Sequence, residues 1–177
     1  MLKGNHIGLR AIEENDLAVL LAWRNKPEFR IYFREHRELS MKNQKEWFES
    51  INKRDSGVRM FSIVRSSDSA LMGACGLCYH DPINRSADLS IYLGQDDLYI
   101  DEKYAPDAAR VLLRYGFSEL NLHRVWAEIY DMDEKKKKFF ETLGFQLDGR
   151  FRESHWTQGK WCDSLFYGIL QREFSEI

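Results

Sequence analysis

The sequence contains few residues that would cross-link a fold or interrupt its elements. Its 177 residues include three cysteines and three prolines. An odd and low cysteine count is typical of a reducing compartment and argues against a disulfide framework. Cys75 and Cys78 have CxxC spacing, but their segment reads as a strand, in which residues three apart face opposite sides. No second Cys or His pair stands nearby, so we interpret both as ordinary strand residues and expect no metal.

Long apolar runs and a strong net charge are absent as well. No apolar run approaches the roughly 20 residues that span a bilayer, and the first six residues lack a signal peptide's apolar stretch. The net charge of -2 provides no basic field for nucleic acid. We therefore expect a cytoplasmic protein with neither a membrane nor a nucleic-acid partner. A hydrophobic fraction of 44% suits one packed domain over residues 1–177.

Hydrophobic periodicity predicts an α+β domain with seven strands and four helices. The strands are expected at 6–12, 58–65, 70–79, 87–93, 125–129, 145–153 and 162–170. The helices are expected from Asp16 onward and at 40–52, 106–119 and 134–143, with Asp16 and Ser40 as N-caps. Because the two late helices each cross between strands, parallel neighbours are expected in the middle of the sheet.

The segment 87–93 alternates with a period of two. Ala87, Leu89, Ile91 and Leu93 take one face, while Asp88, Ser90 and Tyr92 take the other. This pattern predicts a strand with one core face and one polar face.

Several short motifs occur along the chain in a fixed order. They are Leu9-Arg-Ala with Asp16-Leu, Trp23-Arg-Asn, Leu71-Met-Gly-Ala-Cys-Gly-Leu, Tyr115-Gly-Phe, Leu120-Asn-Leu-His-Arg-Val, Leu143-Gly-Phe and Gly159-Lys-Trp-Cys-Asp. No single motif is specific, but the ordered set resembles the GNAT superfamily of acetyltransferases. It is most similar to the branch that acetylates ribosomal-protein N-termini and to its amino-sugar relatives.

This resemblance implies a fold, a co-substrate and a reaction. The fold is a mixed, mostly antiparallel sheet of about seven strands, with splayed middle strands and about four flanking helices. The co-substrate is acetyl-CoA, and a primary amine (a protein N-terminus, an amino sugar or a small amine) attacks it directly in a ternary complex. The family is also compatible with a homodimer. The implied cofactor-binding residues are Ile91, Tyr92, Leu93, Lys103, Tyr104, Ala105, Asp107, Ala108, Asp133, Lys136 and Phe140.

The phosphate-binding loop departs from the family pattern. Asp101, Lys103 and Ala105 stand where the family has glycines, which let backbone N–H groups approach phosphate, and Pro106 lacks an N–H. Either the helix N-terminus still binds the pyrophosphate, with the acids turned to solvent and Lys103 inward, or the chain is a weakened, non-catalytic binding domain. Carboxylates of Asp101 or Glu102 filling that pocket would overturn the catalytic assignment.

A second departure lies on the helix at 134–143. Asp133 and Phe140 occupy the family's Asn and Tyr positions, and Phe140 has no proton for the leaving thiolate. A thiol pKa near 8.5 makes that thiolate a tolerable leaving group, with Tyr130 and Tyr92 as substitute acids. Otherwise Phe140 is simply core. Lys136 either belongs to a solvated helix face or meets the CoA 3′-phosphate.

The proposed catalytic residues are Asp88, Tyr92 and Glu128. Either carboxylate can take the amine's proton, or both merely order the cleft. His36, His80, His123 and His155 are weaker candidates for a base. Arg34 and Arg37 suit an anionic or sugar-like acceptor, although a peptide N-terminus is the alternative, and Asp163 is expected to organise the acceptor side. A different acyl-CoA donor is a further alternative.

Overall fold

The computed structural model describes residues 1–175 and contains one continuous eight-stranded sheet. The strands are β1 (Leu2–Lys3), β2 (Ile7–Ala11), β3 (Arg59–Arg65), β4 (Leu71–Asp81), β5 (Ser86–Leu93), β6 (Arg124–Tyr130), β7 (Gln146–Thr157) and β8 (Lys160–Leu170). Their spatial order is β1-β2-β3-β4-β5-β6-β8-β7. All neighbours pair antiparallel except β5 and β6, which confirms the predicted mixed, mostly antiparallel sheet.

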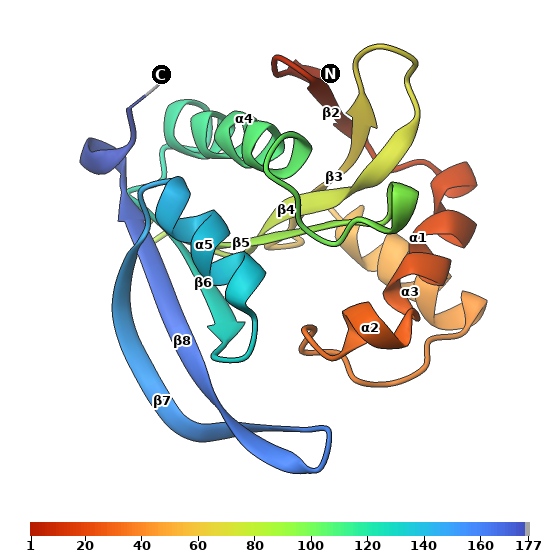
Figure 1. Ribbon diagram of the computed structural model, residues 1–177. Coiled ribbons are helices and arrows are strands. Elements are labelled where there is room, and N and C mark those ends of the chain that lie inside the picture. Colours follow the sequence, from red (N-terminus) through yellow and green to blue (C-terminus); the bar gives the residue numbers. More distant parts are fainter. Residues whose placement is uncertain (176–177) are drawn as a thin grey trace.

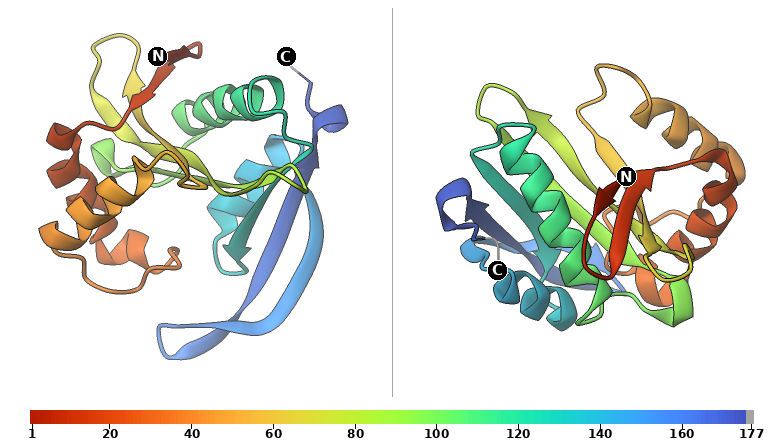
Figure 2. Two further views of the ribbon diagram at one scale, coloured as in Figure 1. Left: turned by 180° about the vertical axis from the view of Figure 1, so that it is seen from behind. Right: turned by 90° about the horizontal axis from the view of Figure 1, so that it is seen from above.

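Five α-helices flank this sheet. They are α1 (Leu17–Arg24), α2 (Pro27–Arg30), α3 (Met41–Ile51), α4 (Tyr104–Ser118) and α5 (Glu134–Thr142). Figure 1 and Figure 2 show α4 lying across one face of the sheet and α1 to α3 grouped on the other side. The seven predicted strands and four predicted helices are all present, while β1 and the single turn α2 were not predicted. Within residues 1–175, no helix combines the length and apolar character that a membrane crossing requires.

Local signals account for several element boundaries. The Ser40 side chain accepts a hydrogen bond from the Asn43 N–H at 3.3 Å, as predicted for the N-cap of α3. The β7–β8 hairpin turns at Gln158 and Gly159, both with positive φ, the conformation of a two-residue hairpin turn. Cys75 is buried, Cys78 is partly buried, and both are free thiols.

The strand β5 differs from the prediction in one respect. Its alternation is present, but its predicted polar face is covered, since Asp88 and Tyr92 are only 3% and 4% exposed. The segment between α1 and α3 folds over this face, and its Phe33 ring lies 5.5 Å from the ring of Tyr92. Asp88 therefore carries its charge in an enclosed setting.

Asp16 does not cap α1 with its side chain, so this prediction was wrong. Its carboxylate instead accepts hydrogen bonds from Arg10 at 2.7 and 2.8 Å, from the Ser62 hydroxyl at 2.7 Å and from the Glu13 N–H at 3.0 Å. Burial by itself would raise the pKa of Asp16, but these donors outweigh it and lower the pKa. Asp16 thus ties the entry of α1 to β2 and β3.

We expect Asp16→Asn to lower the free energy of unfolding by about 2 kcal/mol at pH 7, because buried donors lose a charged acceptor. A carboxyl whose pKa is lowered by folding stabilises above its unfolded pKa, roughly pH 4, and loses this effect as the pH falls through the folded pKa. The gap between wild type and variant should therefore shrink by pH 3 in urea unfolding. A gap under about 0.5 kcal/mol at pH 7 would contradict this role.

Candidate active site

The site lies where the parallel strands β5 and β6 separate. They pair only through Ser86–Arg124, Ala87–Val125 and Asp88–Trp126, although β5 continues to Leu93 and β6 to Tyr130. Beyond Asp88, β5 and β6 therefore form no further main-chain pairs with each other. This is the splay of middle strands that the resemblance to the GNAT superfamily implied.

The main chain of β5 provides a donor in this gap. The Gly94 N–H bonds toward β4, to the Met72 carbonyl, and the Leu93 N–H bonds the opposite way, to the Tyr99 carbonyl at 2.8 Å. Since N–H groups alternate between the two edges of a strand, the Ile91 N–H points to the β6 side. Among the predicted residues 91–93, the N–H groups of Ile91 and Leu93 face the gap. The Leu93 N–H is bonded to Tyr99, so the Ile91 N–H is the donor that a ligand could use.

Two carboxylates and one guanidinium meet at the point of separation. Arg34 donates from Nε to Glu128 at 2.9 Å and from its two terminal nitrogens to the two oxygens of Asp88 at 3.1 and 3.4 Å. Burial lowers the pKa of Arg34, but the two carboxylates outweigh it and raise the pKa. Burial also raises the pKa of Asp88, and Arg34 offsets part of that effect. The predicted Asp88 and Glu128 are thus brought together through Arg34.

Aromatic rings flank this ionic cluster. The Arg34 guanidinium lies 5.6 Å from the ring centroid of Tyr79 and 5.8 Å from that of Trp126. Tyr92 lies four residues from Asp88 along β5, and burial raises its pKa to about 12. Tyr130 stacks on His155 at 3.6 Å, and burial raises its pKa to about 12 as well. Both phenols therefore keep their protons at neutral pH, but a raised pKa makes each a weaker acid for the leaving thiolate.

Lys136 points into the protein body. Its Nζ lies 5.2 Å from the ring centroid of Tyr99, and burial lowers its pKa against the attraction of Asp133 and Asp88. Asp133 caps α5 by accepting from the Lys136 N–H at 3.0 Å and also accepts from the Tyr99 hydroxyl at 3.0 Å. The predicted Asp133 and Lys136 therefore line the inner side of the gap, together with Tyr99, for which the sequence carried no signal.

The other predicted residue of α5, Phe140, lies in the core. It is 1% exposed, and its ring packs against Phe139, Phe145 and Tyr167 at 5.0, 4.9 and 6.3 Å. This placement agrees with the simpler of the two sequence interpretations, in which Phe140 fills the core. Any proton for the leaving group then comes from another source.

The amino end of α4 is partly occupied by the protein itself. The Asp101 carboxylate accepts from the N–H groups of Tyr104 at 3.0 and 3.1 Å and of Ala105 at 2.8 Å. The expectation that Asp101 turns to solvent was therefore wrong, because a short carboxylate at this distance before a helix satisfies its first donors. Glu102 does turn outward and bonds Lys138 at 2.6 Å. Lys103 is exposed rather than turned inward, so this prediction was wrong.

A groove of about 760 Å³ nevertheless opens beside this helix end. Its walls are formed by the start of α4 and by α5, and include Ile100, Pro106, Lys135, Lys138 and Phe139. The same lining also includes the carboxylates of Asp101, Glu102 and Glu134, and Lys138 is already paired with Glu102. The groove thus has the volume for a nucleotide, but the Asp101 carboxylate occupies N–H groups at the helix end that a diphosphate would use. The side chain of Asp107 faces away and accepts from main-chain N–H groups of residues 5, 6 and 7, and Ala108 is buried.

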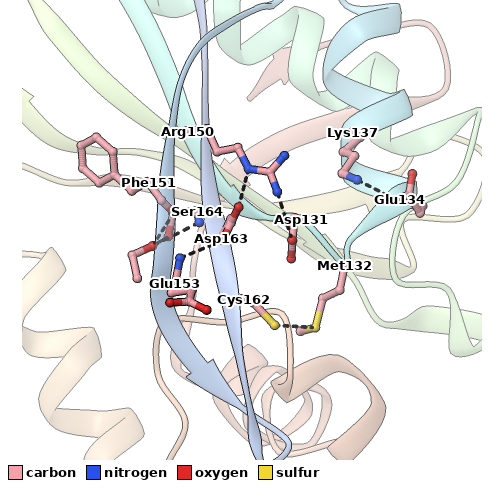
Figure 3. Close-up of polar contacts among 11 residues, drawn as sticks. Asp131, Met132, Glu134, Lys137, Arg150, Phe151, Glu153, Cys162, Asp163 and Ser164 are labelled. Carbon is pink, nitrogen blue, oxygen red and sulfur yellow. Dashed lines mark hydrogen bonds and ion pairs between the residues drawn. The ribbon is translucent and has the colours of Figure 1, made fainter.

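The remaining predicted residues lie on the acceptor side. Arg37 bonds its neighbour Glu35 at 2.6 and 2.9 Å, which leaves Arg34 as the arginine of this segment at the cluster. Asp163 holds the β7–β8 hairpin together by accepting from the Glu153 N–H at 2.7 Å and by pairing with Arg150, which reaches toward Asp131 (Figure 3). The main-chain bond, helped by Arg150, lowers the pKa of Asp163. Asp163 thus organises a hairpin rather than serving as a base.

Comparisons with known proteins agree with this geometry. The profile of the acetyltransferase (GNAT) domain matches residues 6–146. The uncharacterized N-acetyltransferase p20 of Bacillus licheniformis is 26% identical over 169 residues, which cover 94% of each chain. The putative ribosomal N-acetyltransferase YdaF of Bacillus subtilis is 29% identical over 107 residues, covering 60% of this chain and 57% of YdaF. A crystal structure of spermidine N-acetyltransferase from Vibrio cholerae with CoA and spermine superposes with a TM-score of 0.86 at 25% identity, covering 95% of this chain and 97% of that one.

Proposed function

The chain belongs to the GNAT acetyltransferase domain family, and on this premise we propose that it acetylates a primary amine with acetyl-CoA by direct attack in a ternary complex. The observation that carries the proposal is the separation of β5 and β6 immediately after Asp88. It creates a gap with a main-chain donor on one wall and two carboxylates at its closed end.

Asp88 and Glu128 have different roles, because Arg34 contacts a different number of oxygens on each carboxylate. Arg34 engages both oxygens of Asp88 but one oxygen of Glu128, and the Glu128 side chain is 21% exposed. Glu128 therefore has a free oxygen that can take the amine's proton, directly or through water, while Asp88 orients Arg34. The Ile91 N–H is aimed to stabilise negative charge on the reacting carbonyl oxygen.

Acetyl-CoA, when bound, supplies the acetyl group as a thioester. The groove between α4 and α5 is expected to hold its nucleotide, with Lys135 or Lys138 near its phosphates and Lys136 directed to the inner gap. A thiol pKa near 8.5 means that the departing thiolate needs little help from an acid at neutral pH. The absence from this chain of the tyrosine found in the family, at the position of Phe140, is therefore compatible with turnover.

Calorimetry and a thiol-release assay test this proposal. We expect acetyl-CoA to bind in low salt and to release CoA thiol only when a primary amine is present. A panel of acyl-CoA donors in the same assay tests donor choice. A folded protein that binds no acetyl-CoA at low salt would instead support a non-catalytic domain. The homodimer and the cytoplasmic location remain predictions.

A further inference from the structure

A second hollow adjoins the site on the side of α3. Its volume is about 400 Å³, and its lining includes Arg24, Gln44, Trp47 and Tyr92. Tyr92 follows Ile91, whose N–H points into the gap between β5 and β6. The hollow therefore lies against β5, the strand that also forms one wall of the gap.

Arg24 brings an unpaired charge to this hollow. Its guanidinium carbon lies 4.6 Å from the ring centroid of Phe33 and 5.9 Å from that of Tyr92. Its Nε is buried without a hydrogen-bond partner, and Arg24 forms no ion pair within residues 1–175. The other charged side chains of the lining are paired, in Arg37–Glu35 at 2.6 Å and Lys42–Glu46 at 3.8 Å. Arg24 is thus the cation in the described lining that is ready for an anion.

Gln44 provides a second, independent observation. It is 4% exposed, yet its side-chain amide forms no hydrogen bond with any part of the chain that the structure describes, and it lines the same hollow. The amide atoms of Gln44 are open to the hollow, since the Arg24 Nε is the buried side-chain atom that lacks a partner within residues 1–175, and they are therefore available to a ligand. An amide that is open to the hollow and a guanidinium without an ion pair, both in the same lining, are donors that suit an acidic ligand.

We propose that Arg24 and Gln44 bind an anionic group, a carboxylate or a phosphate, carried by the acceptor amine. The inference rests on the proposed amine acetylation and assigns its substrate class. The amine would lie at the gap near Glu128, and the acid would lie beneath α3.

The ionic cluster argues against a polycationic acceptor. A second ammonium would seek Asp88 and Glu128 between the rings of Tyr79 and Trp126, but Arg34 already fills that position. Such an acceptor would also meet the unpaired charge of Arg24. Although this chain shares its fold with a spermidine acetyltransferase, we therefore expect a polyamine to be a poorer acceptor than an amine that carries an acidic group.

Binding of four amines of similar length, measured by calorimetry with CoA present, tests this assignment. We expect γ-aminobutyrate and aminopropyl phosphate to bind about 10- to 100-fold more tightly than butylamine, as a charge-assisted contact predicts, and putrescine to bind most weakly. The tighter of the two anions identifies the acidic group. Butylamine binding as tightly as the anions, or putrescine binding best, would overturn the proposal.

Variants assign the preference to residues. Arg24→Met should remove it, Arg24→Lys should keep part of it, and Gln44→Leu should reduce it without a change of charge. Lys45→Met removes a charge from the exposed face of the same α3 and should leave the preference intact. Thermal melts establish that each variant is folded, and Gln44→Leu carries the test if Arg24→Met is not.

The thiol-release assay separates this inference from the proposed function. If the anionic amines bind through Arg24 and no thiol is released, the acetylation proposal fails and the binding site stands. If every amine releases thiol at the same rate whatever its charge, acetylation stands and the anionic substrate class is wrong.

Discussion

Glu128→Gln is expected to lower kcat for acetyl transfer by about 10²- to 10⁴-fold at neutral pH, the usual contribution of a general base. Glutamine retains an oxygen that can accept the Arg34 Nε–H, which now bonds Glu128 at 2.9 Å, so the cluster should keep its geometry. The variant loses the ability to take a proton and one of the two negative charges that pair with Arg34. The KM for acetyl-CoA should therefore change little.

The pH profile distinguishes a base from a structural carboxylate. An alkyl amine has a pKa near 10.4 and arrives protonated at pH 7, so the base is needed there. As the pH rises toward that value, more amine arrives unprotonated and the loss in Glu128→Gln should shrink. Glu153→Gln makes the same chemical change at an exposed position of the hairpin and should leave kcat unchanged. A loss below threefold, or one that is equal at every pH, would assign Glu128 to ordering the cleft.

The parts of the fold that follow from local periodicity were predictable from the sequence. Strands such as 87–93 and helices such as 40–52 can be recognised from the sequence, because their apolar side chains recur with the period of a single element. The short elements β1 and α2 carry too few residues for a period to appear. Asp16 was misjudged because its partner Ser62 is 46 residues away, a distance that no capping rule covers.

The candidate site was predictable residue by residue but not as an assembly. Asp88 and Glu128 were identified on separate strands, and only the register Asp88–Trp126 brings the two strands together at that point. Arg34 was expected to meet the acceptor, but it is held by the protein's own carboxylates. Of the two arginines in the described lining of the hollow, Arg24 is instead the one without an ion pair, a distinction that depends on which partners the tertiary fold supplies and that leaves no trace in the sequence.

Asp101→Ala is expected to tighten the binding of CoA by about tenfold and to destabilise the free protein. In the free protein the Asp101 carboxylate holds the N–H groups of Tyr104 and Ala105, two of the donors that a diphosphate would use, and Pro106 has none to add. CoA must therefore displace this carboxylate. Loss of such a cap usually costs about 1 kcal/mol of stability, close to the 1.4 kcal/mol that corresponds to a tenfold change in affinity.

Calorimetry with CoA and urea unfolding of the free protein measure the two effects. Asp101→Asn keeps a capping oxygen without the charge, so it should show a smaller gain in affinity and nearly normal stability. Glu102→Ala removes an equal charge that pairs with Lys138 away from the helix end and should change affinity by less than about threefold. The cap contacts of Asp101 stabilise the free protein and are broken when CoA binds. Their removal should therefore lower the free energy of unfolding by about as much as it strengthens the binding of CoA. Weaker binding in Asp101→Ala would mean instead that Asp101 shapes the loop for the nucleotide rather than competing with it.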